Sequence, residues 1–359
     1  MSGRWRIAWD VAGGDYAPEA PLEALKRVCG REDFAELEFL LLGDETFLRG
    51  ALVRQGLASE AGRCRIVHAP EVIANEEEPV RALRRKPNAS IARGLELLAA
   101  GEADAFLSAG STGAVMAGGL LKVGRIRGVE RPGLAPVFPT ADGRGVLVLD
   151  VGANVDAKPQ HLLDYALLGQ TYVRFVLDVQ RPRVGLLNVG VEEGKGNALA
   201  KEAYRLLSST PAVNFVGNVE ARDVLFGVAD VVVTDGFSGN VFLKAVEGTA
   251  QFALDALKEA LTSTLRARFG ALLALPAVKQ VLRRFDYKEY GASPLLGLKR
   301  PVFKAHGSSD ARAFVAALRT IRRFLAADLQ EKLVESLAAG RGEIPPESGS
   351  GGDGTGERI

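Results

Sequence analysis

The chain has 359 residues, of which 47% are hydrophobic and 25% charged, and its formal net charge is +1. This composition is typical of a soluble globular protein and gives no overall electrostatic attraction for nucleic acid or for an acidic partner. Two cysteines without metal-ligand spacing argue against a disulfide framework and against a zinc site, which suits a reducing cytoplasm. We expect no signal peptide and no membrane-spanning helix, because no apolar run is long enough.

Short apolar runs alternate along the chain with longer segments of helical periodicity, for example at 18–28, 88–100 and 196–207. Several runs, such as VLVLD and VVVT, are continuously apolar, as strands covered on both faces of a mainly parallel sheet are. The alternation predicts a doubly wound α/β fold. The predicted strands are Arg6–Asp10, Glu38–Gly43, Cys64–His68, Ala105–Ser108, Val146–Asp150, Arg183–Val189, Asp230–Thr234 and Val302–Ala305.

Six glycine-containing loops follow these strands, at 10–18, 108–119, 150–159, 188–197, 234–240 and 304–310. Ligands of open parallel sheets bind outside the carboxyl ends of the strands. Bare N–H groups and a positive helix-dipole end at such a loop suit an anion, especially phosphate. The predicted phosphate-binding residues are Gly13, Gly14, Asp15, Ser111, Thr112, Gly113, Asn154, Gly194, Gly196, Asn197, Gly236, Ser238 and Gly239.

The loop NVGVEEGKGN places Lys195 at the start of a helix, among three glycines that let the backbone approach a ligand. It is not a P-loop, because Gly190 and Gly194 are too close and Gly196 replaces the hydroxyl residue, so Mg-nucleotide binding is not supported. Glu192 and Glu193 could hold the lysine. A plain glycine turn with solvated charges is the alternative.

The loop TDGFSGN follows the most apolar strand and places Asp235 and Asn240 at its exit. Asn240 could donate its amide to a developing oxyanion, and Asp235 could position the reacting groups. An Asx turn with a helix cap is the alternative for both. In 150–159, Asn154 stands among Asp150, Asp156 and Lys158, and the paired carboxylates could do acid–base work or simply cap the next helix.

His306 is the one histidine in a loop of this type, and a packing role is its alternative. A second feature is the basic segment PVRALRRKPN, with Arg84, Arg85 and Lys86, which is either a solvated face or a dock for an acidic partner. No G-x-S-x-G elbow occurs, so a covalent serine mechanism is poorly supported. Phosphate acting directly as nucleophile needs only positioning and charge stabilisation.

Residues 250–290 have helical periodicity without a strand and predict a helical hairpin, divided by Pro276. Its basic residues are Arg266, Arg268, Lys279, Arg283 and Arg284. Such an amphipathic hairpin could pack on the body or on a dimer partner, or lie on an anionic membrane. Residues 338–359 are rich in Gly, Pro and Ser, which predicts a disordered tail after a single domain over 1–337.

From about residue 6 to 330 the chain resembles the bacterial phosphate acyltransferase family, PlsX. The resemblance rests on successive motifs in family order, which are DVAGGDYAPE, EPVRALRRKPNAS, SAGSTGAVMAG, LDVGANVDAKPQHL, PRVGLLNVGVEEGKGN, NFVGNVEARD, ADVVVTDGFSGNV, YKEYGASPLLGL and KAHGSSD. Two departures occur: Ser111 stands where the family usually has asparagine, and Ala292 and Ser293 alter the YGGAPLLG loop.

The resemblance implies acyl transfer from acyl-[acyl-carrier-protein] to inorganic phosphate, giving an acyl phosphate that a glycerol-3-phosphate acyltransferase uses in phospholipid synthesis. It implies a Rossmann-like three-layer α/β/α fold, similar to phosphotransacetylases and the isocitrate and isopropylmalate dehydrogenases. It also implies a homodimer in the cytoplasm, peripheral on the inner face of the cell membrane, without metal or organic cofactor. The family's catalytic lysine and asparagine fall at Lys195 and Asn240.

Three rival functions remain open on the residues. A phosphotransacetylase would use acyl-coenzyme A in place of the carrier protein. A scaffold for lipid enzymes at the membrane surface would keep the amphipathic hairpin but would need neither Lys195 nor Asn240 in such loops. A dehydrogenase of the related fold is disfavoured, because no G-x-G-x-x-G follows the first strand.

Overall fold

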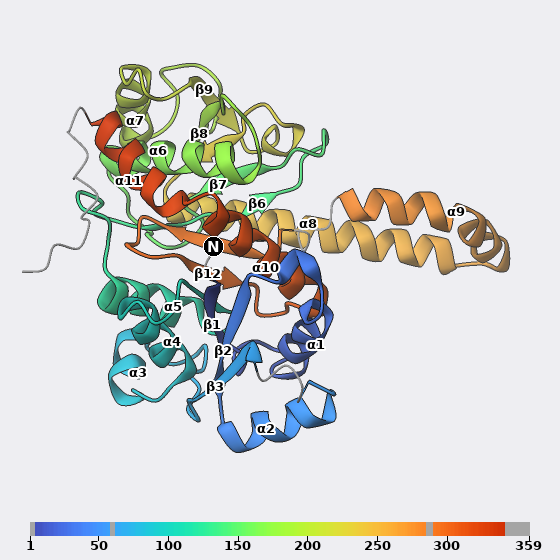
Figure 1. Cartoon of the computed structure of the whole chain (residues 1–359). Coiled ribbons are helices and arrows are strands. Elements are labelled where there is room, and N and C mark those ends of the chain that lie inside the picture. The colour runs from blue at the N-terminus through green and yellow to red at the C-terminus, as the bar shows by residue number, and fades with distance from the viewer. Residues whose placement is uncertain (1–3, 58–61, 285–289, 342–359) are drawn as a thin grey trace, which may run out of the picture.

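The computed structural model describes residues 4–57, 62–284 and 290–341, which form two sheets with helices on both sides (Figure 1). The larger sheet has seven strands in the order β3-β2-β1-β4-β12-β11-β5. Its strands are β1 (Trp5–Asp10), β2 (Leu37–Gly43), β3 (Cys64–His68), β4 (Ala105–Ser108), β5 (Gly133–Leu134), β11 (Ala292–Leu296) and β12 (Val302–Ala305). Strands β3, β2, β1, β4 and β12 are parallel, and β11 runs antiparallel to β12 and β5.

The smaller sheet has five strands in the order β6-β7-β10-β8-β9. They are β6 (Val137–Phe138), β7 (Val146–Leu149), β8 (Val184–Asn188), β9 (Phe215–Glu220) and β10 (Val231–Val233), and only β6 is antiparallel to its neighbour. The central strand β10 consists of three valines without solvent exposure. Such a strand needs helices on both faces, because neither face can meet water.

Eleven α-helices occur in the described part of the chain, and several begin with a capping side chain. They are α1 (Glu19–Val28), α2 (Glu45–Arg54), α3 (Pro79–Arg85), α4 (Ser90–Ala99), α5 (Thr112–Gly118), α6 (Pro159–Val176), α7 (Ala198–Ser208), α8 (Gly236–Thr262), α9 (Leu265–Arg284), α10 (Ala311–Ala326) and α11 (Leu329–Gly340). Asp44, Glu78, Asn197 and Asp310 cap their helices by accepting from backbone N–H groups.

Alternate residues of the strands divide the interior into two apolar clusters. Trp9 and Leu41 pack with Phe314 of α10 and with α1, and the same cluster continues under the smaller sheet to α6 and α11. Ala8 and Phe106 point to the opposite face, toward α3, α4 and α5. Helices α6, α10 and α11 thus join the two halves of the molecule into one body (Figure 1).

The predicted α/β class and all eight predicted strands are confirmed, with every bound within one residue of the one expected. The structure has two sheets, where the alternating pattern indicated one mainly parallel sheet. Strands β5, β6, β9 and β11 were not predicted. The first two are only two residues long, and the others contain Gly217 or Pro294, which read as turn residues.

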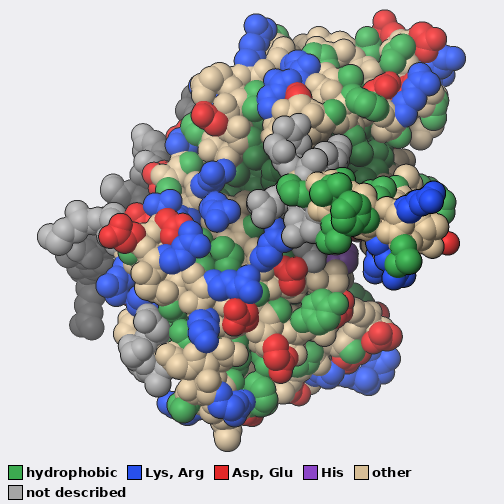
Figure 2. Space-filling model, turned by 90° about the vertical axis from the view of Figure 1, so that its right-hand side faces the viewer, with side chains coloured by type: hydrophobic (Ala, Val, Ile, Leu, Met, Phe, Trp, Pro, Cys, Tyr) green, Lys and Arg blue, Asp and Glu red, His purple; other side chains and the backbone are tan. Residues whose placement is uncertain are grey.

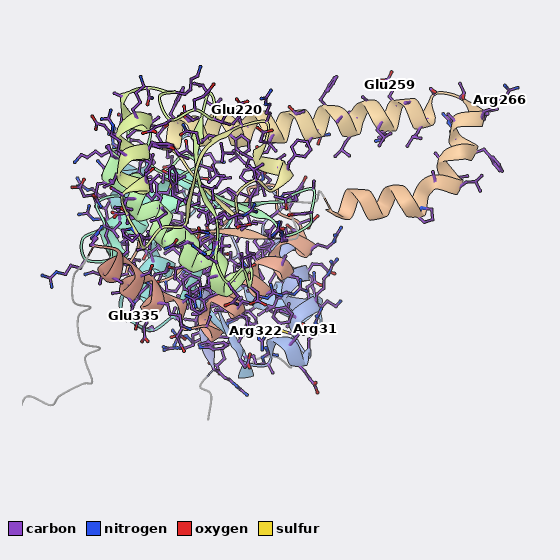
Figure 3. The ribbon with its side chains drawn as sticks, turned by 90° about the horizontal axis from the view of Figure 1, so that it is seen from above. Arg31, Glu220, Glu259, Arg266, Arg322 and Glu335 are labelled. Carbon is purple, nitrogen blue, oxygen red and sulfur yellow. The ribbon has the colours of Figure 1, made fainter. Side chains whose placement is uncertain are left out.

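The predicted hairpin is present as α8 and α9, which project from the body, with Arg266 close to the tip (Figure 3). The expected division at Pro276 is wrong, because Pro276 lies inside α9. The break comes at Ser263 and Thr264, where the Thr264 Oγ1 accepts from the Ala267 N–H at 3.1 Å and caps α9. A bend in α9 is visible in Figure 3, as expected for a helix with an internal proline.

Helix α11 ends at Gly340, slightly beyond the predicted start of the tail at residue 338, and 342–359 lie outside the described residues, as do 285–289. In the described part of the chain, no helix combines the length and apolar character needed to cross a membrane.

Candidate active site

The loop after β7 packs directly on the first turn of α8. The Gly236 N–H donates to the Asn154 carbonyl at 2.9 Å, and a Cβ at Gly239 would lie 1.9 Å from the Asp150 carbonyl oxygen. Only glycine allows this approach, so two of the predicted phosphate-binding glycines bring two chain segments together. The carboxyl edges of β7 and β10 therefore form one surface.

Asp150 organises the loop after β7. Its buried carboxylate accepts from the N–H groups of Leu134 and Ala153 at 3.0 and 2.9 Å, and from Asn154 N at 2.7 Å. Burial raises the pKa of this carboxyl. The Asn154 side chain donates to Pro132 O at 2.7 Å and to Asp150 at 3.0 Å, so it holds the loop in shape and its amide is not free to bind phosphate.

Asn240 lies in the second turn of α8 against the loop after β7. Gly152, with a φ of +123°, lies beside it, because a Cβ there would be in ordinary van der Waals contact with the Asn240 Cγ at 3.5 Å. The Asn240 side chain is exposed, and its amide has no hydrogen-bond partner among the described residues. Asp235 caps α8, with its Oδ1 accepting from the Ser238 N–H at 2.8 Å. The amide donor of Asn240 is thus available, while Asp235 fixes the helix that carries it.

Lys195 follows β8, the strand that pairs with β10. The Asn188 side chain donates to the Lys195 carbonyl at 3.2 Å, and the Lys195 N–H donates to Glu192 O at 3.1 Å. Asn218 of β9 donates to the same Glu192 carbonyl at 2.8 Å. The loop backbone is therefore fixed, while the Lys195 side chain is exposed and forms no ion pair with any described residue, including Glu192 and Glu193.

The remaining predicted residues of this loop act on its backbone. Gly196 has a φ of +90°, and a Cβ there would lie 2.4 Å from the Asn188 Oδ1. Asn197 caps α7 by accepting from the Ala200 N–H at 2.9 Å, and Gly194 is open to solvent. The loop thus presents one free cation, Lys195, next to the edge that carries Asn240.

The larger sheet contributes three loops at the carboxyl ends of β1, β4 and β12. A Cβ at Gly13 would lie 2.4 Å from the Asp10 Oδ2, and Gly14 has a φ of +104°. The Asp15 N–H donates to the Gly307 carbonyl at 2.8 Å, which joins the β1 and β12 loops. Ser111 caps α5 weakly, Thr112 is exposed, and Gly113 packs on Pro79. These segments meet, as their places after neighbouring parallel strands predict.

His306 connects this half to α8. Its Nε2 lies 3.6 Å from the Glu247 Oε1, and its Nδ1 lies 2.8 Å from the Ser308 hydroxyl. Burial lowers the His306 pKa, and the Glu247 carboxylate opposes that effect. Glu247 is two helical turns beyond Asn240, so both lie on one face of α8, about 10 Å apart along its axis. Helix α8 therefore spans the distance from the Asn240 edge to the loops of the larger sheet.

The two predicted basic patches lie on different elements. Arg84 and Arg85 are exposed at the end of α3, whereas Lys86 is bound to Glu77 at 2.6 Å and to the Val72 carbonyl at 2.9 Å. Arg266 and Arg268 are exposed near the hairpin tip, and Arg268 donates to Thr262 O at 3.0 Å. The side chains of Lys279, Arg283 and Arg284 lie outside the described part of the structure.

Three charged residues beside the predicted ones were not identified from the sequence. Lys304 is buried at the end of β12, and Lys244 and Glu247 form an ion pair at 2.7 Å on the face of α8 that carries Asn240. Lys244 is four residues after Asn240, a helical spacing that could have indicated it. Lys304 begins the motif KAHGSSD, but nothing in the sequence shows that a lysine at the end of a strand is buried.

A substitution at Gly239 tests the packing on which the site depends. We expect Gly239→Ala to lower the free energy of unfolding by about 3 kcal/mol, because the added methyl overlaps a backbone carbonyl that cannot move freely. Gly248→Ala is the matched control on the same helix, where nothing lies within 4 Å, and it should raise stability by about 1 kcal/mol through helix propensity. Urea unfolding measures both, and equal midpoints for the two variants would contradict the packing described.

Comparisons with known proteins agree with this arrangement. Residues 5–332 match the family described as "Fatty acid synthesis protein". A phosphate acyltransferase of Bacillus licheniformis is 51% identical over 91% of this chain and 98% of its own, and that of Bacillus subtilis is 48% identical over 92% and 98%. The chain belongs to the phosphate acyltransferase family. It is therefore an acyltransferase with phosphate as acyl acceptor, in the pathway of fatty acid and phospholipid synthesis.

Two solved structures of similar fold are named as phosphotransacetylases. A phosphotransacetylase from Streptococcus pyogenes has a TM-score of 0.57 at 19% identity, covering 90% of this chain and 94% of its own. The EutD phosphotransacetylase from Staphylococcus aureus has a TM-score of 0.56 at 17% identity, covering 91% and 94%. At such identities the likeness confirms the predicted fold and says nothing of the substrate.

Proposed function

We propose that this phosphate acyltransferase takes a fatty acyl group from acyl-[acyl-carrier-protein] and gives an acyl phosphate for phospholipid synthesis. The observation that carries the proposal is the edge of the smaller sheet, where an unpaired Lys195 and an unpaired Asn240 amide follow neighbouring strands on fixed backbone. A cation and a neutral donor at one edge suit an anionic nucleophile and a developing oxyanion.

In the proposed reaction a phosphate oxygen attacks the thioester carbonyl carbon. Asn240 donates to the oxygen that becomes negative in the tetrahedral state, and Lys195 holds the attacking phosphate. The C–O bond forms, the C–S bond breaks, and the carrier leaves as a thiol after taking up a proton. No residue of the chain forms a bond to the acyl group, so a covalent enzyme intermediate is not part of the mechanism.

Roles for the remaining predicted residues follow from their contacts. Asp235 fixes the start of α8, and His306 links that helix to the larger sheet through Glu247. Both position the reacting groups without touching them. The glycine loops of the larger sheet, with Gly13, Gly14 and Gly307, pack on one another beside His306 and supply N–H groups for an anion.

We further propose that the hairpin serves the fatty substrate. Leu265, Phe269, Leu272 and Leu273 are exposed on α9, and hydrophobic side chains gather on the projecting helices in Figure 2. Together with Arg266 and Arg268 they form an amphipathic surface that suits an anionic membrane or a second copy in a homodimer. The carrier protein, which is acidic, would dock on this basic end or on Arg84 and Arg85 of α3, and a glycerol-3-phosphate acyltransferase would consume the product.

The rival donor is acyl-coenzyme A, as the names of the proteins of similar fold suggest. Purified protein is incubated with palmitoyl-carrier protein or palmitoyl-coenzyme A, with and without phosphate, and acyl phosphate is trapped with hydroxylamine. We expect phosphate-dependent hydroxamate mainly from the carrier thioester. Faster reaction of the coenzyme A ester would contradict the carrier-protein thioester as the donor. Loss of thioester without phosphate would support a covalent route.

Membrane contact is tested separately. Co-sedimentation of the protein with anionic vesicles in the same reactions measures it.

A further inference from the structure

Three polar residues lie side by side at the carboxyl ends of three neighbouring strands of the larger sheet, in the last or next-to-last position, and all three are buried. In the strand register Asp10 of β1 faces Ser108 of β4, and Ser108 faces Lys304 of β12. Their strand neighbours Trp9, Leu107 and Phe303 belong to the core of the opposite face, so the three polar side chains point to the same side of the sheet. The row lies directly beneath the loops that carry Gly13, Gly110 and Gly307.

Hydrogen bonds connect this row to the loops in one continuous chain. The Lys304 ammonium donates to the Ala109 carbonyl at 3.4 Å and to the Ala305 carbonyl. The N–H of the next residue, Gly110, donates to the Ser108 hydroxyl at 3.0 Å, and that hydroxyl donates to the Asp10 carboxylate at 2.7 Å. The peptide group between Ala109 and Gly110 is thus held at both ends.

The chain of contacts continues into the β1 loop and returns to β12. Asp10 accepts from the Ala12 N–H at 3.2 Å, and the Asp15 N–H donates to the Gly307 carbonyl at 2.8 Å. The N–H groups of Gly14 and Gly307 themselves donate to no described residue. Fixed loops with unused donors next to a buried cation are arranged to receive an anion.

Lys304 is only 8% exposed and forms no ion pair with a described residue. Burial lowers its pKa to about 8, although the charges of Asp10 and Asp15 favour the ammonium form. Because this pKa is below the ordinary value of 10.5, the stability that the residue contributes rises as the pH increases between the two values. A buried ammonium is therefore unfavourable for folding, and a role in stability does not explain it.

We propose that Lys304 is a positioning residue for phosphate-dependent acyl transfer, which acts through Ser108 and Asp10 to hold the loops after β1, β4 and β12 as one anion-receiving rim. The inference rests on the family's acyl transfer to phosphate and adds a residue group on the larger sheet, whose β12 loop contacts α8 through His306 and Glu247. In this proposal the rim supplies N–H groups to the same phosphate that Lys195 holds.

The test compares steady-state acyl transfer by wild type, Lys304→Met, Lys304→Arg and Ser108→Ala, with Lys299→Met as a control at an exposed lysine near the same strand. We expect Lys304→Met to raise KM for phosphate roughly 10-fold, the scale of a lost charge-assisted hydrogen bond, and KM for the acyl donor less than twofold. Its Tm should be unchanged or higher, since the buried charge is gone. Lys304→Arg should restore part of the phosphate KM.

The pH profile gives a second readout that a purely structural role would not move. In wild type, kcat/KM for phosphate should fall above about pH 8 as Lys304 loses its proton. The fall should shift to higher pH in Lys304→Arg and disappear in Lys304→Met. An unchanged profile in Lys304→Met, or equal rises of both KM values, would overturn the proposal. If both Lys304 variants fail to fold, Ser108→Ala decides, since a wild-type phosphate KM in that variant would overturn it.

Discussion

Lys195→Ala should lower kcat for acyl phosphate formation by about 10²–10³-fold, the range found when one preorganised charge-stabilising group is removed. The side chain is exposed and forms no ion pair with a described residue, so its loss removes nothing that the fold uses. The Tm should therefore stay within a degree or so of wild type. The hydroxylamine trap with carrier-bound palmitate measures the rate.

Lys201→Ala is the matched control, because Lys201 is an exposed lysine on α7, shortly after the same loop. It should keep wild-type activity. Lys195→Arg separates charge from geometry, since arginine keeps the charge but presents a planar fork in place of a compact ammonium. Activity of Lys195→Ala equal to that of Lys201→Ala would remove Lys195 from the mechanism and leave it as a solvated lysine in a glycine turn.

Asn240→Asp should lower kcat by about 10²-fold or more, because the carboxylate keeps the shape of the amide but replaces its N–H donor by a negative acceptor. The developing oxyanion would then meet repulsion instead of a hydrogen bond. Stability should change little, since the amide has no partner among the described residues and contacts only the Gly152 region. The KM for the acyl donor should change far less than kcat, as for a contact made in the transition state.

Gln180→Glu is the control, because it also converts an amide to an acid. Gln180 is exposed and lies away from the loops at the carboxyl ends of the strands. Asn240→Ala adds the loss of the donor without the new charge, and its kcat should lie between those of wild type and Asn240→Asp. If Asn240→Asp and Asn240→Ala are both fully active, the oxyanion is stabilised elsewhere, and the backbone N–H groups of the surrounding loops become the candidates.

The local sequence predicted the elements that carry the site. Continuous apolar runs such as VVVT marked the buried strands, and the helix cap given as the alternative for Asp235 is present at the start of α8. Because parallel strands place their carboxyl ends at one edge, the sequence alone predicts a common edge for the loops with Lys195 and Asn240. The successive motifs, in the order that the family has them, indicated the family.

Several parts of the arrangement were decided only by the tertiary structure. The division into two sheets, the short strands and the break of the hairpin at Thr264 depend on pairings and caps that periodicity does not show. Asn154 looked like a ligand residue and is a buried support of its loop.

Lys304 is the clearest such case, since a lysine at the end of a strand usually reaches water. It lies buried beside β4 and the loop after that strand, which are distant in sequence, and this burial lowers its pKa. Sequence periodicity and capping are local, so they determine which segments form strands and helices and which edge their loops share. Burial and charge coupling are sums over neighbours from the whole chain, so only the folded structure determines which of those loop residues are free for chemistry and which hold the others in place.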